Sequence, residues 1–184
     1  ESYATAEAAG DDRALFNGVN RTLDNDDVAT FKSGFGVAKF TNFKTDGSAG
    51  HDATFPDADF FLMRAAEAYL NFAEADARIN GGQTTDEGTA AINAIRKRAN
   101  ASTREDKGYS LSDICDEWSR EFYFEGRRRM DLIRFNRFGG NVNYNWQWKG
   151  GTKEGRNFSK DLNIFAIPTN ELTSNKNLTQ NPGY

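Results

Sequence analysis

The sequence has 184 residues and a formal net charge of −4, a size typical of one domain or of part of one. This mild acidity argues against a nucleic-acid-binding protein, because the Lys and Arg residues alternate with Asp and Glu and form no uniformly basic stripe. No apolar run approaches the roughly 18–20 residues of a membrane span. Cys115 is the only cysteine, which excludes an intrachain disulfide and a cysteine-based metal site. Its place in a helical pattern predicts a buried side chain.

Residues 1–56 give weak structural signals. Their first fifty positions are rich in Gly, Asp, Asn and Thr, which predicts irregular loops, although residues 31–43 alternate enough for a short strand or two. Apolar residues concentrate instead at 60–138 and 162–168. This imbalance predicts two regions: a loop-rich segment, 1–56, that packs on a missing N-terminal part, and a helical region, 57–184. We expect any export signal upstream of Glu1.

The clearest element is a helix predicted over residues 59–79. Two apolar stripes run along it at helical spacing. The first consists of Phe61, Ala65, Ala68, Phe72, Ala75 and Ile79, and the second of Leu62, Ala66, Tyr69, Leu70, Ala73 and Ala77. Because the helix is apolar on most of its circumference, we expect it to lie between other helices, with Phe72 buried. The following Asn80-Gly81-Gly82 predicts its end, since glycine suits a left-handed C-cap.

Three further helices are predicted after Gly82. Thr84 and Glu87 have the spacing of a capping box at the start of the second helix. Ser110 or Ser112 caps the third, which Gly126 breaks, and the fourth covers 127–138. The apolar residues of the second and third helices are Ile92, Ile95 and Ala99, and Leu111, Ile114, Cys115, Trp118 and Phe122. We therefore predict a mainly α fold of tetratricopeptide-like helix pairs with long irregular loops, in which Trp118 is buried and residues 162–168 dock on the helices.

The segment SREFYFEGRRRMDLIRF, residues 119–135, combines carboxylates with arginines. Glu121 and Glu125 are four residues apart and share a helix face, so they could serve as the acid and nucleophile of a glycosidase. However, arginines three to seven residues from each carboxylate favour a charge network that orients helices. Such a network lowers carboxylate pKa values, the opposite of what a general acid requires. We therefore predict a protein that is not an enzyme.

The loop Tyr144-Asn145-Trp146-Gln147-Trp148 is the best candidate for ligand binding. Its three aromatic residues alternate with polar ones, so an extended backbone would place the rings on one face. Sugar rings stack on aromatic planes, and Asn and Gln can bind hydroxyl groups. The alternative is that Tyr144, Trp146 and Trp148 anchor the loop on the helices.

Asp57 and Asp59 are candidate ligands for a structural Ca²⁺, a cation that takes oxygen ligands. The alternative is that one of these aspartates caps the helix expected to begin near Phe60. Beyond this calcium hypothesis, the residues indicate no cofactor.

Three stretches together resemble the SusD/RagB family of outer-membrane nutrient-binding lipoproteins. They are FPDADFFLMRAAEAYLNFAEA at residues 55–75, the segment 119–135 with Phe124-Glu125-Gly126, and NIFAIPTNELTSNKNLTQNPGY at residues 163–184. They occur in the family's order, the second helix AINAIRKRA is also similar, and the chain ends where the family's chains end. We therefore expect the C-terminal portion of such a protein.

The resemblance implies a surface glycan-binding subunit, held at the outer membrane by a lipid on an N-terminal segment absent here. The implied partner is a SusC-type TonB-dependent transporter, and the implied ligand is an oligo- or polysaccharide. Stretches like WQWKGG occur widely in the family, which favours the anchoring role of Trp146 and Trp148, and in starch-binding relatives Ca²⁺ is associated with the region of Asp57. A peptide-binding interaction module is the alternative function, because helix-pair scaffolds commonly bind peptides.

Overall fold

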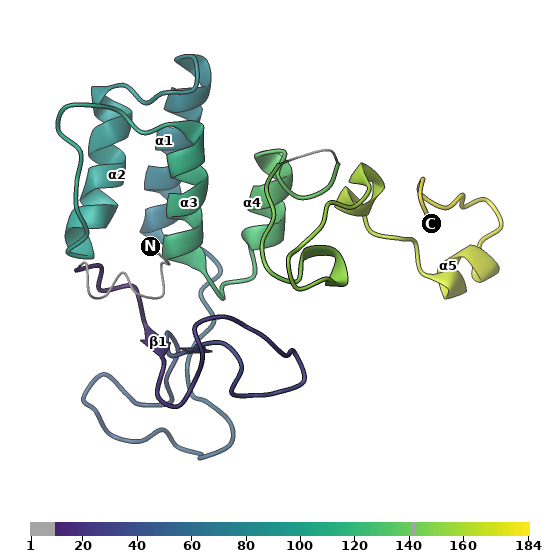
Figure 1. Ribbon diagram of the computed structural model, residues 1–184, viewed down its shortest axis with the longest axis horizontal. Coiled ribbons are helices and arrows are strands. Elements are labelled where there is room, and N and C mark those ends of the chain that lie inside the picture. Colours follow the sequence, from purple (N-terminus) through teal and green to yellow (C-terminus); the bar gives the residue numbers. More distant parts are fainter. Residues whose placement is uncertain (1–9, 141–142) are drawn as a thin grey trace. The chain divides into compact units, whose positions relative to one another are not determined.

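The computed structural model describes residues 10–140 and 143–184 (Figure 1). It consists of two compact units, Glu1–Gly126 and Arg127–Tyr184. The first unit contains a two-stranded antiparallel pair, β1 (Phe16–Asn17) and β2 (Gly36–Val37). Its helices are α1 (Ala65–Ile79), α2 (Asp86–Arg98) and α3 (Leu111–Phe122). Helices are thus the main regular elements of the described chain, as predicted.

The core of the first unit lies where α1, α2 and α3 meet. Leu70 of α1, Ile92 of α2 and Trp118 of α3 are all fully buried. The Trp118 indole also finds a polar partner, because its Nε1 donates a hydrogen bond of 3.0 Å to Glu74 Oε2 on α1. Cys115 is buried beside it. The predicted burial of Trp118 and Cys115 is therefore confirmed.

Helix α1 differs from its prediction at its beginning and in the face that it buries. It starts at Ala65 rather than at residue 59, and its N-cap residue Arg64 makes no capping hydrogen bond with its side chain. Packing against α2 and α3 buries four residues of the second stripe, namely Ala66, Leu70, Ala73 and Ala77. The first stripe stays open, and Phe72 is 52% exposed. The prediction that Phe72 is buried is therefore wrong for this structure, because the core forms on the side of α1 that carries Leu70, Ala73 and Ala77.

Residues at the ends of the helices determine where each helix stops and where the next one begins. Gly81 and Gly82 adopt positive φ angles of 69° and 93° after α1, which confirms the glycine-rich stop. The residue that caps α2 is Thr85, whose side chain accepts from Gly88 N, rather than Thr84. The Thr84 hydroxyl is instead buried, and it accepts a hydrogen bond from Tyr109 N. Ser110 forms the capping box of α3 with Asp113.

The second unit contains two short helices and long loops. Its helices are α4 (Arg128–Arg134) and α5 (Thr169–Ser174), so the helix predicted over 127–138 is shorter than expected. Two 3-10 turns, η2 (Lys149–Gly151) and η3 (Lys160–Asn163), lie between them. Arg129 of α4 holds the 162–168 stretch, because its Nη2 donates to Leu162 O at 2.8 Å and its guanidinium lies 3.9 Å from the centre of the Phe165 ring.

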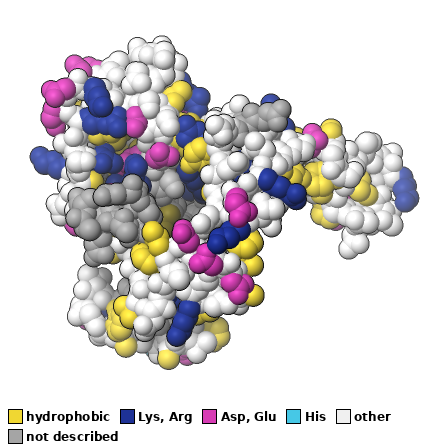
Figure 2. Space-filling view, in the orientation of Figure 1, with side chains coloured by type: hydrophobic (Ala, Val, Ile, Leu, Met, Phe, Trp, Pro, Cys, Tyr) yellow, Lys and Arg dark blue, Asp and Glu magenta, His cyan; other side chains and the backbone are white. Residues whose placement is uncertain are grey.

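The surface agrees with the charge pattern of the sequence. On the face shown in Figure 2, Lys and Arg side chains are interspersed with Asp and Glu. Among the described residues, no helix combines the length and the apolar character that crossing a membrane demands.

Candidate functional site

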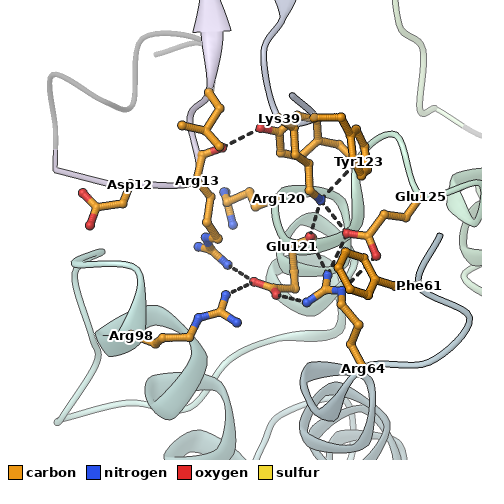
Figure 3. A pocket seen from close by; sticks show the side chains of 12 residues that line it. Asp12, Arg13, Lys39, Phe61, Arg64, Arg98, Arg120, Glu121, Tyr123 and Glu125 are labelled. Carbon is orange, nitrogen blue, oxygen red and sulfur yellow. Dashed lines mark hydrogen bonds and ion pairs between the residues drawn. The ribbon is translucent and has the colours of Figure 1, made fainter. Parts of the chain in front are cut away.

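A charged pocket of about 290 Å³ lies at the C-terminal end of α3 in the first unit (Figure 3). Segments far apart in the sequence form it. Its lining residues are Asp12, Arg13, Leu15, Lys39, Phe40, Phe61, Arg64, Arg98, Arg120, Glu121, Tyr123 and Glu125. The pocket therefore lies between the N-terminal loops, the segment that leads into α1, and the C-terminal ends of α2 and α3.

Glu121 is the centre of the charge network in this pocket. Its carboxylate accepts hydrogen bonds from Arg64 Nη1 at 2.7 Å and from Arg98 Nη2 at 2.6 Å. A third arginine, Arg13, approaches at 3.1 Å. Glu121 itself is 3% exposed, so three cations from three different segments converge on one buried carboxylate.

Glu125 lies beyond the end of α3, which stops at Phe122, so the prediction that Glu121 and Glu125 share a helix face is wrong. Glu125 is nevertheless held in the same way as Glu121. Arg64 binds it through two nitrogens, with Nε 2.9 Å from Oε2 and Nη2 2.8 Å from Oε1. The ammonium of Lys39 lies 2.5 Å from Glu125 Oε1 and also donates to the carbonyl oxygens of Glu121 and Tyr123. These contacts fasten the loop around Lys39 to the end of α3.

Glu117, one turn before Glu121, completes a row of three carboxylates. It is 1% exposed, and it pairs with Arg13 at 2.7 Å and with Arg96 at 2.6 Å. Arg13 also pairs with Asp11 beside it. Because Arg13 belongs to the N-terminal loops and Arg96 to α2, the row connects both to α3.

The network changes the acidity of its carboxylates. Burial by itself raises the pKa of Glu121, but hydrogen bonds from Arg64 and Arg98 outweigh it, so the pKa lies below its ordinary value. The same balance, with Arg64 and Lys39 as donors, lowers the pKa of Glu125. Both groups are therefore ionised at neutral pH and hold no proton to give to a leaving group. A charge network is thus present as predicted, but the cations at Glu121 and Glu125 come from distant segments and not from the neighbouring arginines of 119–135. Neither carboxylate is the protonated acid of a glycosidase.

Sequence reasoning found Glu121 and Glu125 but missed Glu117 and the most distant cations of this network. Arg13 and Lys39 lie in loops without periodicity, and they reach Glu121 and Glu125 across 108 and 86 positions of sequence. The signal that could have drawn attention to them is the surplus of buried-face carboxylates on α3. Glu117 and Glu121 share one face of α3, and Glu125 follows three residues after its end. These carboxylates need cations from elsewhere in the chain.

The aromatic loop lies in the second unit, where its rings contact one another and Phe138. The Tyr144 and Trp146 rings meet edge to face with centroids 6.3 Å apart, and Trp146 stacks near Phe138 at 6.4 Å. Arg128 Nη2 donates to the Tyr144 hydroxyl at 2.7 Å. Trp146 remains 37% exposed. These contacts favour anchoring of the loop, and they leave part of the Trp146 ring open to a ligand.

The backbone of this loop turns where an extended strand was expected. Trp148 adopts a left-handed φ of 65°, and the η2 turn follows directly. The side chain of Lys149 is buried beneath the turn, where its ammonium donates to Tyr144 O at 2.7 Å and lies 4.8 Å from the centre of the Trp146 ring. The expectation that an extended backbone aligns all three rings is therefore wrong. A glycan-binding role of Tyr144, Trp146 and Trp148 stays a prediction.

Asp57 and Asp59 lie in the loop before α1. Asp57 Oδ2 accepts a hydrogen bond from His51 N, and Asn42 Oδ1 accepts one from Asp57 N at 3.0 Å. Neither aspartate caps α1, which begins after Arg64, so the capping alternative is wrong. Within residues 10–140 and 143–184, no three His, Cys, Asp or Glu residues gather as a metal site. Calcium binding at Asp57 and Asp59 stays a prediction that these contacts leave open.

Known proteins are similar to this chain in both sequence and fold. Residues 3–184 match the SusD family. The chain is 44% identical over 181 residues to the starch-binding protein SusD of Bacteroides thetaiotaomicron, an alignment that covers 96% of this chain and 32% of that protein. The chain thus spans about a third of the length of this relative.

Two solved structures have folds similar to that of this chain. A SusD superfamily protein from Bacteroides vulgatus has a TM-score of 0.64 and 25% identity, over 99% of this chain and 38% of that one. Surface glycan-binding protein A from Bacteroides uniformis has a TM-score of 0.62 and 24% identity, over 94% and 38%. The family match covers nearly the whole chain, and the structural likeness covers the same span. The chain therefore belongs to the SusD family.

Proposed function

We propose that the protein containing this chain is a glycan-binding subunit at the bacterial cell surface, and that starch or a related glycan is its ligand. The observation that carries the proposal is the 44% identity to a starch-binding protein over 96% of this chain. The protein is lipid-anchored at the outer membrane and passes captured oligosaccharide to a SusC-like TonB-dependent transporter. No nucleic acid takes part.

The charged pocket supports binding without catalysis. A glycosidase needs one protonated carboxylic acid beside one ionised carboxylate. The pKa values of Glu121 and Glu125 are both lowered, and both carboxylates are occupied by arginine or lysine. Ion pairs of this kind hold loops and helices in place, so we assign the row a structural role in a protein that binds glycan and leaves it intact.

Calorimetry on the full-length protein tests the proposal. Titration with starch fragments should give saturable binding, and chromatography of the same mixture should show no new products. Titration with peptides provides the competing measurement, because helix-pair scaffolds also bind peptides. Binding of peptides in place of every glycan offered would support the alternative function, and release of shorter sugars would contradict the non-catalytic role.

The transporter partnership requires a separate test. The full-length protein, solubilised with its lipid anchor from its native membrane, should co-purify with a TonB-dependent barrel. The matched control is the same protein expressed without its lipidated N-terminal segment. If no barrel accompanies the anchored form, the partnership is contradicted while the glycan-binding proposal stands.

A further inference from the structure

Two Asn-Gly pairs occur in the sequence, Asn17-Gly18 and Asn80-Gly81. In such a pair the backbone nitrogen of the glycine can attack the side-chain amide carbon of the asparagine, because glycine has no side chain that hinders the approach. Both asparagines are exposed. The two pairs differ, however, in how firmly the surrounding contacts hold the attacking nitrogen and the amide.

Asn80-Gly81 lies in an open turn directly after α1. Gly81 has a positive φ of 69°, and a side chain added there would meet nothing within 4 Å. Within residues 10–140 and 143–184, no acceptor binds the Gly81 N–H. An exposed turn with few contacts opens locally at a low cost in free energy. The Gly81 nitrogen is therefore free to rotate towards the Asn80 side chain.

Asn17-Gly18 is held more firmly. Asn17 belongs to β1 and pairs with Gly36 of β2, and its Oδ1 accepts a hydrogen bond from Val19 N at 3.0 Å. A side chain added at Gly18 would come within 3.0 Å of the Phe35 ring. The same two residue types thus occur twice in the first unit, once in an open turn and once in a paired strand, which provides an internal comparison.

The Asn80 side chain also connects the end of α1 to the start of α2. Its Nδ2 donates to the backbone oxygen of Asp76 at 2.8 Å and to Asp76 Oδ1 at 3.1 Å. The Asp76 carboxylate in turn accepts from Thr85 N at 2.7 Å and from Thr85 Oγ1 at 3.0 Å. Thr85 is the N-cap of α2. The Asn80 amide acts in this chain of contacts only as a donor.

We propose that Asn80 is a deamidation site whose conversion loosens the connection between α1 and α2. The Gly81 nitrogen forms a bond to Asn80 Cγ, the bond from Cγ to Nδ2 breaks, and the amide leaves as ammonia together with the proton from Gly81. Water then opens the resulting succinimide to aspartate or isoaspartate. The sequence consumes one water and releases one ammonia, and no group is oxidised or reduced.

The product is poorly matched to its surroundings. A carboxylate at position 80 has no N–H to donate, so both hydrogen bonds to Asp76 are lost. Its negative charge lies beside the Asp76 carboxylate and at the C-terminal end of α1, where the helix dipole disfavours an anion. Isoaspartate also lengthens the backbone of the turn. Each change weakens the contact through which Asp76 holds Thr85.

Peptide mapping of the full-length protein tests the site. The folded protein is incubated at mildly alkaline pH, digested under acidic conditions that stop the reaction, and analysed by mass spectrometry. Each conversion rate is divided by the rate at the same position in the chain unfolded in guanidinium. By this measure Asn80 should convert at least about fivefold faster than Asn17, because β1 must first separate from β2. A rate at Asn80 equal to or below that at Asn17 would overturn the assignment.

Two substitutions in the full-length protein test the consequence. Asn80→Asp should lower the melting temperature, since the donor to Asp76 is lost. Asn17→Asp is the matched control, because an aspartate there still accepts from Val19 N, and its melting temperature should stay close to that of the unsubstituted protein. Equal melting temperatures in the two variants would contradict the loosening of the α1–α2 connection. Glycan binding is measured separately, so these outcomes leave the proposed function untouched.

Discussion

Glu121 shows at the scale of one residue how the first unit is held together. Its carboxylate is 3% exposed and receives Arg13, Arg64 and Arg98. A buried carboxylate is costly to desolvate, and only such a set of partners makes it tolerable. The periodicity of α3 indicates which carboxylates share a face, but the identity of their partners depends on the path of loops that have no repeating pattern.

Removing the charge of Glu121 should therefore weaken the fold. We expect Glu121→Gln to lower the free energy of unfolding of the full-length protein by about 3 kcal/mol, because three arginines lose their shared counter-ion. Denaturant unfolding measures this change. Glu171→Gln on the exposed α5 is the matched control, and it should change stability by less than about 0.5 kcal/mol. If Glu121→Gln changed the free energy of unfolding by as little as this control, the charge network would contribute little to stability.

The lowered pKa values predict how stability depends on pH. A carboxylate whose pKa is depressed in the folded state stabilises the protein above its unfolded pKa, and this contribution disappears as pH falls through the folded value. The ordinary pKa of Glu is 4.5. We therefore expect the free energy of unfolding to fall as pH drops below about 4.5, and less steeply in Glu121→Gln. Unfolding curves of equal slope in the two proteins would contradict the assignment.

Lys149 gives a prediction for the aromatic loop. Its buried ammonium donates to Tyr144 O and lies against Trp146, so Lys149→Met should lower stability by about 1–3 kcal/mol, since it leaves a carbonyl without its donor. Lys153→Met, on an exposed position of the same loop, is the control. If the aromatic rings only fix the loop in place, both variants should bind glycan with the affinity of the unsubstituted protein. Lost affinity with unchanged stability would instead assign the loop to ligand binding.

At the scale of elements, the sequence predicts the three helices of the first unit and the stops between them. Their apolar periodicity and the caps at Gly81 and Ser110 are local signals, and the structure follows them. Which stripe of α1 is buried is a different matter, because it depends on the neighbours that are present. Apolar character predicts a helix from residue 59, but Arg64 is in an extended conformation and α1 begins only at Ala65.

Phe72 of α1 and Trp118 of α3 differ in burial, so replacing each with alanine should lower the free energy of unfolding by different amounts. Trp118→Ala should destabilise the full-length protein by about 3–5 kcal/mol, since it empties a fully buried site and frees Glu74 of its indole donor. Phe72→Ala should cost less than about 1 kcal/mol, because the Phe72 side chain is half-exposed. Denaturant melts of both variants measure these values. A loss under about 1 kcal/mol for Trp118→Ala would mean that the core is assigned wrongly.

At the scale of the whole molecule, the resemblance carries more information about function than any single pattern of residues. The three stretches at 55–75, 119–135 and 163–184 are distinctive in combination, and the family match extends over residues 3–184. The glycan site is harder to predict, because the chain spans about a third of its relatives. Rings that bind sugar and rings that fix a loop also have the same sequence signature.

The most direct test of the account is calorimetric titration of the full-length protein with starch fragments, with the mixture checked for breakdown products. We expect saturable binding, an unchanged sugar and the same affinity in Glu121→Gln wherever that variant remains folded, because its carboxylate holds the structure and performs no chemistry. Starch or another glycan that is cleaved by the protein and left intact by Glu121→Gln would contradict the account. Absence of binding to every glycan offered would contradict it as well.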